Sequence, residues 1–424
     1  MGQEVITKKT HNGAEIKIVN TEKFTRNIMS VNFFVPLGDD ASRNALLSRV
    51  MGLGTSKYKT LQELNEFLEI NYGATFNVSV GKKGDNQLIR FSTSFLPDSF
   101  ALEGEKITEI MTEFLHDAIR NPLILDSSFK HDILDIEKQN LINRINSRIN
   151  NKRRYALYRC TEEMCSNEIY GIDELGIPEE IQKITLNDLK IQWEKLLGNS
   201  KVYISCVGRF DNGKIYHFAE KLLDFERRSD INKTLYITKA TKIKTIEEPL
   251  EVNQSILAMG YRLGSLNYSD HMFSYMMFNS IFGGNTTSFL FMNVREKLSL
   301  CYYCSSMLDR LKGLMLVYAG ISAENKDKTY NEITAQLKRI CEGDITEEDI
   351  ADARRDLINR FKEMSDGLTS LEEYYLNCFI GENEMSLDEV IAGLNAVTKE
   401  DIVIVANLVT LDTVYFLTDN SQNK

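Results

Sequence analysis

The chain has 424 residues, two to three times the usual size of a domain, which favours more than one hydrophobic core. Hydrophobic residues make up 43% of the sequence and charged residues 26%, with only 5 prolines, so a disordered or collagen-like chain is excluded. The 61 acidic residues outnumber the 50 basic ones, and a net charge of −11 repels nucleic acids and anionic lipid surfaces.

The cysteines and the N-terminus indicate the compartment. Seven cysteines without regular spacing favour reduced thiols in the cytosol. The N-terminus has no apolar export signal, and position 6 is Ile where a myristoylation signal has Ser or Thr. Every apolar stretch is shorter than a membrane span requires. We therefore expect a cytoplasmic protein that binds neither membrane nor nucleic acid.

The first half of the chain predicts strands and helices together. Alternating apolar residues after an Asn-Gly turn indicate strands, and apolar residues at helical spacing indicate amphipathic helices. The predicted strands cover 14–19, 28–35 and 202–207, with a hairpin over 74–96. The predicted helices cover 43–51, 61–70, 99–119, 127–166, 186–197 and 212–223. The glycine-containing segment 52–57 follows a helix and lacks a dinucleotide fingerprint, so we interpret it as a helix end and turn.

Residues 225–248 are rich in charged residues and Thr and show little apolar periodicity, so we place a linker there. The second half then repeats the pattern of the first. A strand is predicted at 256–261 and a hairpin at 302–322. The predicted helices of this half cover 271–281, 287–298, 327–342, 346–380 and 387–394.

A direct internal echo pairs Ile184–Leu189 with Val397–Ile402, about half the chain apart. In each copy a Thr precedes a helix as a predicted N-cap, and the helix leads into a strand. Chance is the alternative, because Thr-x-x-Asp is a common helix start. The shared order of elements favours an α+β fold of two homologous domains, 1–224 and 249–424, each a mixed or antiparallel sheet with packed helices.

The sequence lacks the usual catalytic motifs. None of its five histidines lies in an H-E-x-x-H or H-x-x-E-H pattern, and no G-x-S-x-G is present. Cys301 and Cys304 have metal-ligand spacing, but no second Cys pair or His accompanies them. At the start of a predicted hairpin, where successive residues face opposite ways, we do not expect these cysteines to hold a metal.

The segment 283–302, from Gly283-Gly284 through Val294-Arg295-Glu296-Lys297 to Cys301-Tyr302, resembles a known pattern. It is similar to the second-domain signature of the M16 (pitrilysin-like) zinc peptidases, GGGxSSRLFxxVREKxGLAY. The resemblance extends to 170–181, 184–189 and 207–211, and so to nearly the whole chain. It implies a half-clamshell of two homologous α+β domains.

The zinc motif of the family is lost in this chain. Alignment on Gly54-Thr55 places Ala45 and Arg49 at the two His positions and Ser48 at the position of the general-base Glu. The stretch that matches the third ligand is Asn140–Ile145, which has no carboxylate, and Glu137 lies about one helical turn too early. Because Ala45 has no donor atom and a guanidinium does not deprotonate, we expect no zinc, no other cofactor and no peptidase activity of the chain alone.

The resemblance also implies a role for the second domain. M16 peptidases of this kind often pair a zinc subunit with a degenerate partner, whose Arg and Tyr, seven residues apart, reach toward the substrate. Arg295 and Tyr302 have these positions here, and a guanidinium and a phenol are suited to bind a carbonyl and a developing oxyanion. The alternative is a solvated charge and a core aromatic. Phe289 replaces a frequent Arg of the family.

Two main hypotheses follow. The first is a non-catalytic subunit that completes the chamber of a catalytic M16 partner with an intact H-x-x-E-H motif and contributes Arg295 and Tyr302 to peptide processing. It resembles degenerate members of bacterial pairs associated with elongation factor P modification or peptide maturation. The second is a structural or peptide-binding module without peptidase function, comparable to the core subunits of respiratory complexes. An active zinc enzyme with unrecognised ligands is a third.

Overall fold

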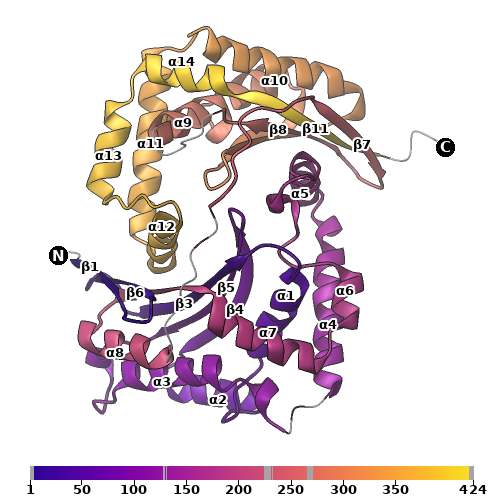
Figure 1. Ribbon diagram of the computed structural model, residues 1–424. Helices are drawn as coiled ribbons and strands as arrows, with labels where there is room; N and C mark the ends of the chain where they lie inside the picture. The colour runs from indigo at the N-terminus through magenta and orange to yellow at the C-terminus, as the bar shows by residue number, and fades with distance from the viewer. Residues whose placement is uncertain are drawn as a thin grey trace. The chain divides into compact units, whose positions relative to one another are not determined.

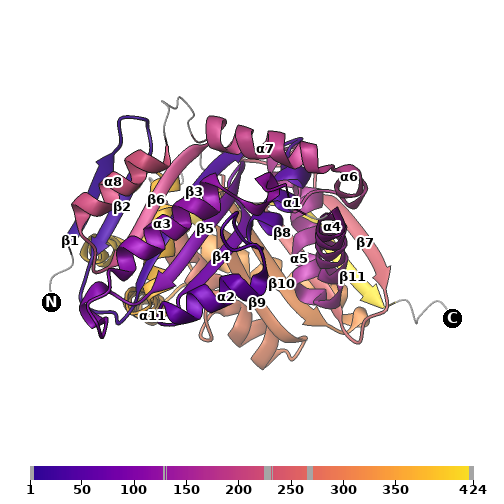
Figure 2. The same cartoon turned by 90° about the horizontal axis from the view of Figure 1, so that it is seen from below.

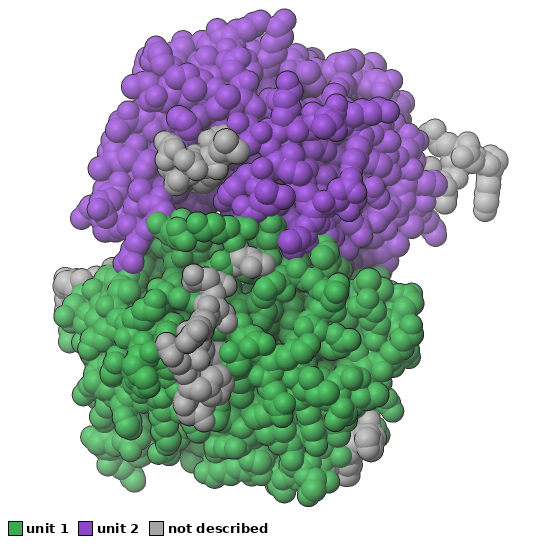
Figure 3. Space-filling model, viewed as in Figure 1, with its two compact units in different colours: residues 1–146, 172–233, 365–382 green, residues 147–171, 234–364, 383–424 purple. Residues whose placement is uncertain are grey.

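The computed structural model describes residues 4–127, 129, 131–223, 231, 233–264 and 271–419. The chain forms two compact units, each a sheet with packed helices (Figures 1 and 3). Unit 1 comprises residues 1–146, 172–233 and 365–382, and unit 2 comprises residues 147–171, 234–364 and 383–424.

The sheet of unit 1 has six strands in the order β1-β2-β6-β3-β5-β4. Strands β2 and β6 are parallel, and the other neighbouring pairs are antiparallel. The strands are β1 (Glu4–Lys9), β2 (Glu15–Asn20), β3 (Asn27–Pro36), β4 (Thr75–Lys83), β5 (Asn86–Phe95) and β6 (Lys201–Gly208).

Both faces of this sheet are buried at its centre, because successive side chains of a strand point to opposite faces. On β3, Phe33 belongs to the large core between the sheet and the helices that cover one face. The next residue, Phe34, packs on the other face with Tyr203, Leu376 and Phe379. The helices of unit 1 are α1 (Ala41–Met51), α2 (Leu61–Ile70), α3 (Ile107–Arg120), α4 (His131–Asn146), α6 (Pro178–Lys183), α7 (Leu186–Asn199), α8 (Asn212–Leu222) and α12 (Leu368–Ile380).

The sheet of unit 2 has five strands in the order β7-β11-β8-β10-β9. They are β7 (Lys244–Leu250), β8 (Ser255–Arg262), β9 (Cys301–Asp309), β10 (Leu314–Ile321) and β11 (Thr410–Asp419). The α-helices are α5 (Lys152–Met164), α9 (Met272–Asn279), α10 (Lys326–Cys341), α11 (Glu347–Ser365), α13 (Leu387–Ala396) and α14 (Lys399–Leu408). Two π-helical segments, η6 (Ser280–Gly284) and η7 (Leu290–Lys297), connect α9 to β9.

The two sheets have the same topology. The order β2-β6-β3-β5-β4 in unit 1 corresponds to β7-β11-β8-β10-β9 in unit 2, and in each the first pair is parallel and the rest are antiparallel. The predicted N-caps Thr185 and Thr398 are observed, and each forms a capping box, with Asp188 and Asp401 respectively. The α+β fold class is therefore confirmed, with β1 as an additional strand of unit 1.

Each unit takes one helix from the other half of the sequence. Helix α5 lies against β8 and β11 of unit 2, where Gly260 permits the close approach, since a Cβ there would lie 2.6 Å from the Met164 sulfur. Helix α12 packs on β3 and β6 of unit 1. The expected domain 1–224 thus contains all strands of the first sheet, and the expected domain 249–424 contains those of the second sheet except the start of β7. That start lies in the expected linker 225–248. Residues 224–230 and 232 of that linker region lie outside the described residues.

Within the described ranges, none of the helices combines the length and the apolar character needed to span a membrane.

Candidate functional site

Helix α1 carries the positions at which the M16 resemblance places the zinc motif. Ala45 is fully buried in the core of unit 1, and Ser48 is buried beside it. The Ser48 hydroxyl donates a hydrogen bond of 2.8 Å to the Ala45 carbonyl oxygen, one turn earlier in the same helix. A hydroxyl in this local bond is not placed to activate water, and the methyl group of Ala45 offers no ligand atom.

Arg49 binds a carboxylate on α4. Its Nε and Nη2 atoms lie 2.7 Å and 2.6 Å from Oε2 of Glu137, whose side chain is almost fully buried. The other carboxylate oxygen, Oε1, accepts a hydrogen bond of 2.9 Å from Asn140 Nδ2. Both oxygens of Glu137 are therefore engaged, and the ion pair joins α1 to α4.

This geometry corrects the expectation about the third ligand position. The sequence alignment matches this position to Asn140–Ile145 and puts Glu137 about one turn too early. In the structure, Glu137 is the carboxylate that faces position 49. Asn140 follows it by three residues and thus lies on the same face of the helix, which explains the displacement by one turn.

Zinc does not fit this donor set. Of the residues at the motif positions, Ala45 has no donor atom, the guanidinium of Arg49 has no acceptor atom to offer a metal, and the carboxylate of Glu137 is paired with Arg49. In the part of the chain that the structure describes, no three His, Cys, Asp or Glu side chains are grouped so that they would hold a metal ion.

Arg295 lies on η7, just before strand β9 of unit 2. Its side chain is 40% exposed, with Nε 3.5 Å from Glu296 Oε1 and the guanidinium 4.5 Å from the centre of the Phe291 ring. These weak local contacts leave the charge available at the surface.

Tyr302 lies at the start of β9, which is the edge strand of its sheet. Cys301 pairs with Ile321 and Tyr303 with Gly320, so Tyr302 is an extra residue at a β-bulge. The bulge turns it outward, and it is 71% exposed. The alternative that Tyr302 is a core aromatic is therefore wrong. Arg295, in contrast, is a partly solvated charge.

The same bulge changes the orientation of the two cysteines. Cys301 and Cys304 are both buried, because the extra residue brings them to the same face of β9. The expectation that they face opposite ways is therefore wrong. A hydrogen bond with Cys304 lowers the pKa of the Cys301 thiol, burial acts in the opposite direction, and the charge of Arg295 has a smaller lowering effect. Their metal role stays unsupported, since no third ligand accompanies them among the described residues.

Phe289 fills a core position instead of offering a charge. It is buried, and the Arg339 guanidinium lies 4.7 Å from the centre of its ring. A guanidinium from α10 is thus present beside the residue that replaces the frequent Arg of the family.

Comparison with known proteins agrees with this site. Residues 183–357 match the family model of the Peptidase M16 inactive domain. The probable inactive metalloprotease YmfF of Bacillus subtilis (strain 168) is 28% identical over 413 residues, which cover 97% of each chain. The resemblance of this chain to the M16 peptidases is thereby confirmed, and both the matched family model and this relative are described as inactive.

Solved structures show the same fold over the whole chain. The crystal structure of a conserved protein from Enterococcus faecalis V583 has a TM-score of 0.91 and 27% identity, and the match covers 99% of this chain and 100% of that one. The structure of a peptidase M16 inactive domain from Pseudomonas fluorescens has a TM-score of 0.80 at 17% identity, with 98% of each chain covered. This second likeness concerns the fold alone.

Proposed function

We propose that this chain is the non-catalytic subunit of a heterodimeric zinc metallopeptidase that processes peptides in the cytoplasm. Its partner is an M16 chain with an intact H-x-x-E-H motif, which holds the only zinc of the pair. This chain completes the substrate chamber and contributes Arg295 and Tyr302 to the zinc site of the partner.

The observation that carries the proposal is the exposure of Tyr302 on an edge strand, close in sequence to the partly exposed Arg295. A phenol that is 71% exposed has its hydroxyl available to another molecule. Such a donor stabilises an oxyanion as it forms, and a guanidinium binds a peptide carbonyl or carboxylate. In contrast, the positions of the zinc motif are closed by the Arg49–Glu137 ion pair.

The surroundings of Arg295 and Tyr302 favour a peptide as the bound molecule. Met292 and Leu298 are exposed apolar residues on or next to η7, and Met307 is exposed on β9. Exposed apolar side chains grouped on adjoining elements are typical of surfaces that contact another chain.

The proposal is tested in two stages. Affinity capture of the tagged chain from its native host should bring down an M16 chain with an H-x-x-E-H motif, identified by mass spectrometry. The reconstituted pair is then assayed for peptide cleavage. Tyr302→Phe should lower kcat, by at most about 10²–10³-fold, the effect of losing one oxyanion donor. Arg295→Ala should lower kcat and also raise KM, because a charged donor holds the ground-state peptide as well.

Two neighbouring residues provide matched controls. Tyr303→Phe removes a phenol hydroxyl from the next position of β9, and Lys297→Ala removes a positive charge from the same helix as Arg295. Gel filtration confirms that each variant still forms the pair. Unchanged kcat and KM in both Tyr302→Phe and Arg295→Ala would favour a structural or peptide-binding module without a shared active site.

A further inference from the structure

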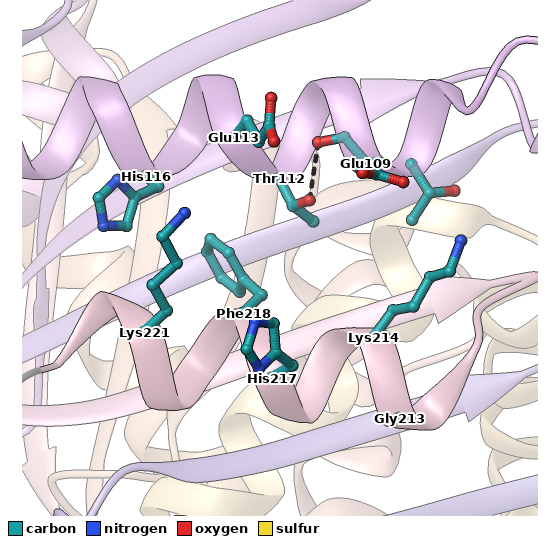
Figure 4. Close-up of a pocket in the computed structure, with 10 residues that line it drawn as sticks. Glu109, Thr112, Glu113, His116, Gly213, Lys214, His217, Phe218 and Lys221 are labelled. Atoms are coloured by element: carbon teal, nitrogen blue, oxygen red, sulfur yellow. Dashed lines mark hydrogen bonds between the residues drawn. The ribbon is translucent and has the colours of Figure 1, made fainter.

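A groove of about 410 Å³ lies between helices α3 and α8 of unit 1, which are side by side over one face of the sheet (Figures 1 and 2). Side chains of both charges line it, among them Glu109, Glu113, Lys214 and Lys221 (Figure 4). The charge of this groove therefore selects neither an anion nor a cation. The surface around the start of α5 in unit 2 is different, because one sign of charge dominates there.

The segment that contains α5 is basic, although the whole chain has a net charge of −11. Residues 139–161 include no acidic residue and six basic ones, which are Arg144, Arg148, Lys152, Arg153, Arg154 and Arg159. Three of these cations stand in the first turn of α5, which has no acidic side chain. Positive side chains at this end of a helix oppose its macrodipole. Stabilisation of the helix therefore does not explain their charge.

Arg153 continues the buried face of α5 onto the neighbouring strands. Ala156 and Cys160, three and seven residues later, are buried against β8 and β11. Arg153, near the start of the helix, reaches past this contact to the other side of the same sheet. Its guanidinium lies 5.8 Å from the centre of the Tyr318 ring on β10 and 5.9 Å from that of the Tyr303 ring on β9. Arg153 is nevertheless exposed, so its N–H groups are available to another molecule.

The sheet supports Arg153 with these two rings. Tyr303 pairs with Gly320, and Tyr318 lies two residues before that glycine, so the tyrosines are diagonal neighbours with ring centres 6.0 Å apart. A Cβ at Gly320 would lie 2.4 Å from Cε1 of Tyr303, so glycine is needed for this ring to lie across β10. A guanidinium held over aromatic rings keeps its N–H groups for a bidentate bond with a carboxylate. The support comes from the rings, and Tyr303→Phe retains it.

The acidic side chains of the surrounding elements have other partners. Glu248 of β7 pairs with Arg159, whose Nε lies 3.3 Å from Oε2, nearer the other end of α5. Asp309 is the only acidic residue in the sequences of β9 and β10, and it accepts a hydrogen bond from the Tyr170 hydroxyl. Among the described residues, no carboxylate lies within ion-pair distance of Arg153. Its charge is therefore available to an anionic group of another molecule.

An apolar strip continues from Arg153 along the same face of the sheet. It consists of two cross-strand pairs, Tyr318 with Ser305 and Leu316 with Met307. Met307 is 47% exposed, and Leu316 and Tyr318 are partly buried. Successive side chains of a strand alternate between the faces, so Met307 lies on the face of Tyr303, roughly 13 Å further along β9. Five residues of an extended peptide span this distance.

We propose that Arg153 binds a carboxylate of a peptide, either an acidic side chain or the C-terminus, and that the peptide lies extended along this strip. Its side chains two and four residues from an acidic residue point the same way as that residue and reach Tyr318, Leu316 and Met307. The proposal names the substrate class of the function proposed above, and it rests on that function only for the fate of the bound peptide. Tyr302 directly precedes Tyr303 on β9, so the strip begins next to the phenol assigned to the reaction.

Fluorescence anisotropy with the full chain alone tests the carboxylate contact. Three rhodamine-labelled peptides are compared: amidated Leu-Ser-Leu-Ser-Glu-Gly, the amidated form with Gln in place of Glu, and the Gln form with a free C-terminus. The first or the third should bind about fivefold to tenfold more tightly than the amidated Gln peptide, and which of them does so identifies the side-chain or the C-terminal carboxylate. If neither binds more tightly than the amidated Gln peptide, the proposal is overturned.

Variants locate the contact at Arg153. Arg153→Gln should remove the advantage of the carboxylate peptide and leave the Kd of the amidated Gln peptide unchanged, whereas Arg153→Lys should retain part of it, because it keeps the charge without the planar fork. Arg154→Gln is the matched control, since it removes the same charge from the next, exposed residue of α5. Circular dichroism confirms that the variants are folded. Equal effects of Arg153→Gln and Arg154→Gln would show a general effect of charge and contradict the contact.

A single capped residue tests whether the strip takes part. N-acetylglutamate amide carries the side-chain carboxylate, and N-acetylglutamine carries a C-terminal one, but neither has the two leucines of the peptides. The unlabelled peptide should displace its labelled form at a much lower concentration than the corresponding single residue. Displacement at equal concentrations would identify a site for small carboxylates, and the proposed peptide site would then be wrong.

Binding to the chain alone and cleavage by the pair give separate answers. If Arg153→Gln weakens peptide binding but the reconstituted pair cleaves no peptide, the contact is supported and the shared active site is not. If the pair cleaves the carboxylate peptide with a KM that Arg153→Gln does not change, the shared active site is supported and the contact at Arg153 is wrong.

Discussion

At position 49 an arginine takes the place of a metal-binding histidine, and its guanidinium holds the side chain of Glu137 against α1. Removing one partner of such a pair leaves the other buried without compensation. Glu137→Gln should therefore lower the free energy of unfolding by about 1–3 kcal/mol. The loss should stay below that of a fully buried pair, since the Arg49 side chain is 26% exposed.

Urea unfolding of a double-variant series measures this contribution. The apolar pair Arg49→Met with Glu137→Leu should be closer in stability to the original chain than Glu137→Gln alone, because no charge is then left unpaired. If Glu137→Gln and the apolar pair were equally destabilised, packing of α1 on α4, and not the ion pair, would be the stabilising contact.

The position of Glu137 also predicts a gain of metal binding. Ala45→His with Arg49→His creates two imidazoles one helical turn apart and releases Glu137 from its ion pair. We expect about one zinc per chain and a zinc-dependent rise in Tm. The new ring at the fully buried position 45 should lower the stability of the metal-free variant. Peptide cleavage should stay low, since Ser48 replaces the general base.

Metal analysis after dialysis measures this, and the further change Glu137→Gln is the control. Zinc binding that does not weaken when Glu137→Gln is added would show that the carboxylate is not a ligand.

At the scale of an element, helix α12 also carries a carboxylate that pairs with an arginine far away in the sequence. Its Glu372 is fully buried on the sheet of unit 1, where it accepts a hydrogen bond of 2.5 Å from the Ser30 hydroxyl and pairs with Arg90. Burial raises the pKa of the Glu372 carboxyl, although Arg90 and Ser30 act in the opposite direction. In the unfolded chain the carboxyl has an ordinary pKa.

This difference predicts a pH dependence with a definite sign. The folded state retains the proton on Glu372 to a higher pH than the unfolded state, so the stability that this proton contributes is present at low pH and is lost as the pH rises through the folded-state pKa. The variant Glu372→Gln should therefore become more stable relative to the original chain between pH 5 and pH 8. Arg90 keeps Glu373 as a partner in the variant.

Urea unfolding at the two pH values measures the change. Glu66→Gln, at an exposed position of α2, controls for the loss of one negative charge. A stability difference for Glu372→Gln that is the same at pH 5 and pH 8 would contradict the assignment.

Local sequence patterns predicted most elements but not their partners. The capping boxes at Thr185 and Thr398 and the hairpin over 74–96 follow from residue type and spacing, and the structure confirms them. The amphipathic pattern of α5 and α12 indicates an apolar face, but periodicity does not specify which sheet that face covers. The exchange of these helices between the halves was therefore not predictable.

Some features of the candidate site were likewise predictable from the sequence and others were not. Loss of the zinc motif is a matter of residue identity at positions 45, 48 and 49, which the sequence states directly. Glu137 and Arg49 face each other because of the way α4 packs against α1, and the two residues are 88 positions apart in the sequence. The apolar pattern of α4 does not show which of its turns lies opposite Arg49. The exposure of Tyr302 depends on one bulge between β9 and β10, and only the pairing of those strands reveals it.

At the scale of the whole molecule, the purified chain should contain no stoichiometric zinc and cleave no peptide on its own. The reason is chemical: the residues at the motif positions provide neither two neutral imidazoles nor a general base, so no water is activated at neutral pH. Metal analysis and cleavage assays with a mixture of fluorogenic peptides test both parts. An M16 peptidase with an intact H-x-x-E-H motif, purified in the same way, is the positive control.

The two measurements have to be combined, because contaminating peptidases also cleave such peptides. Near one zinc per chain, together with cleavage that a chelator abolishes and that is lost in Glu137→Gln, would establish an active enzyme with a ligand set different from that of the family. Cleavage without zinc, or unaffected by Glu137→Gln, points to a contaminant. If the chain is inactive alone but the reconstituted pair cleaves peptides, the activity requires both subunits, and the effects of Tyr302→Phe and Arg295→Ala then decide whether this chain assists the reaction or only encloses it.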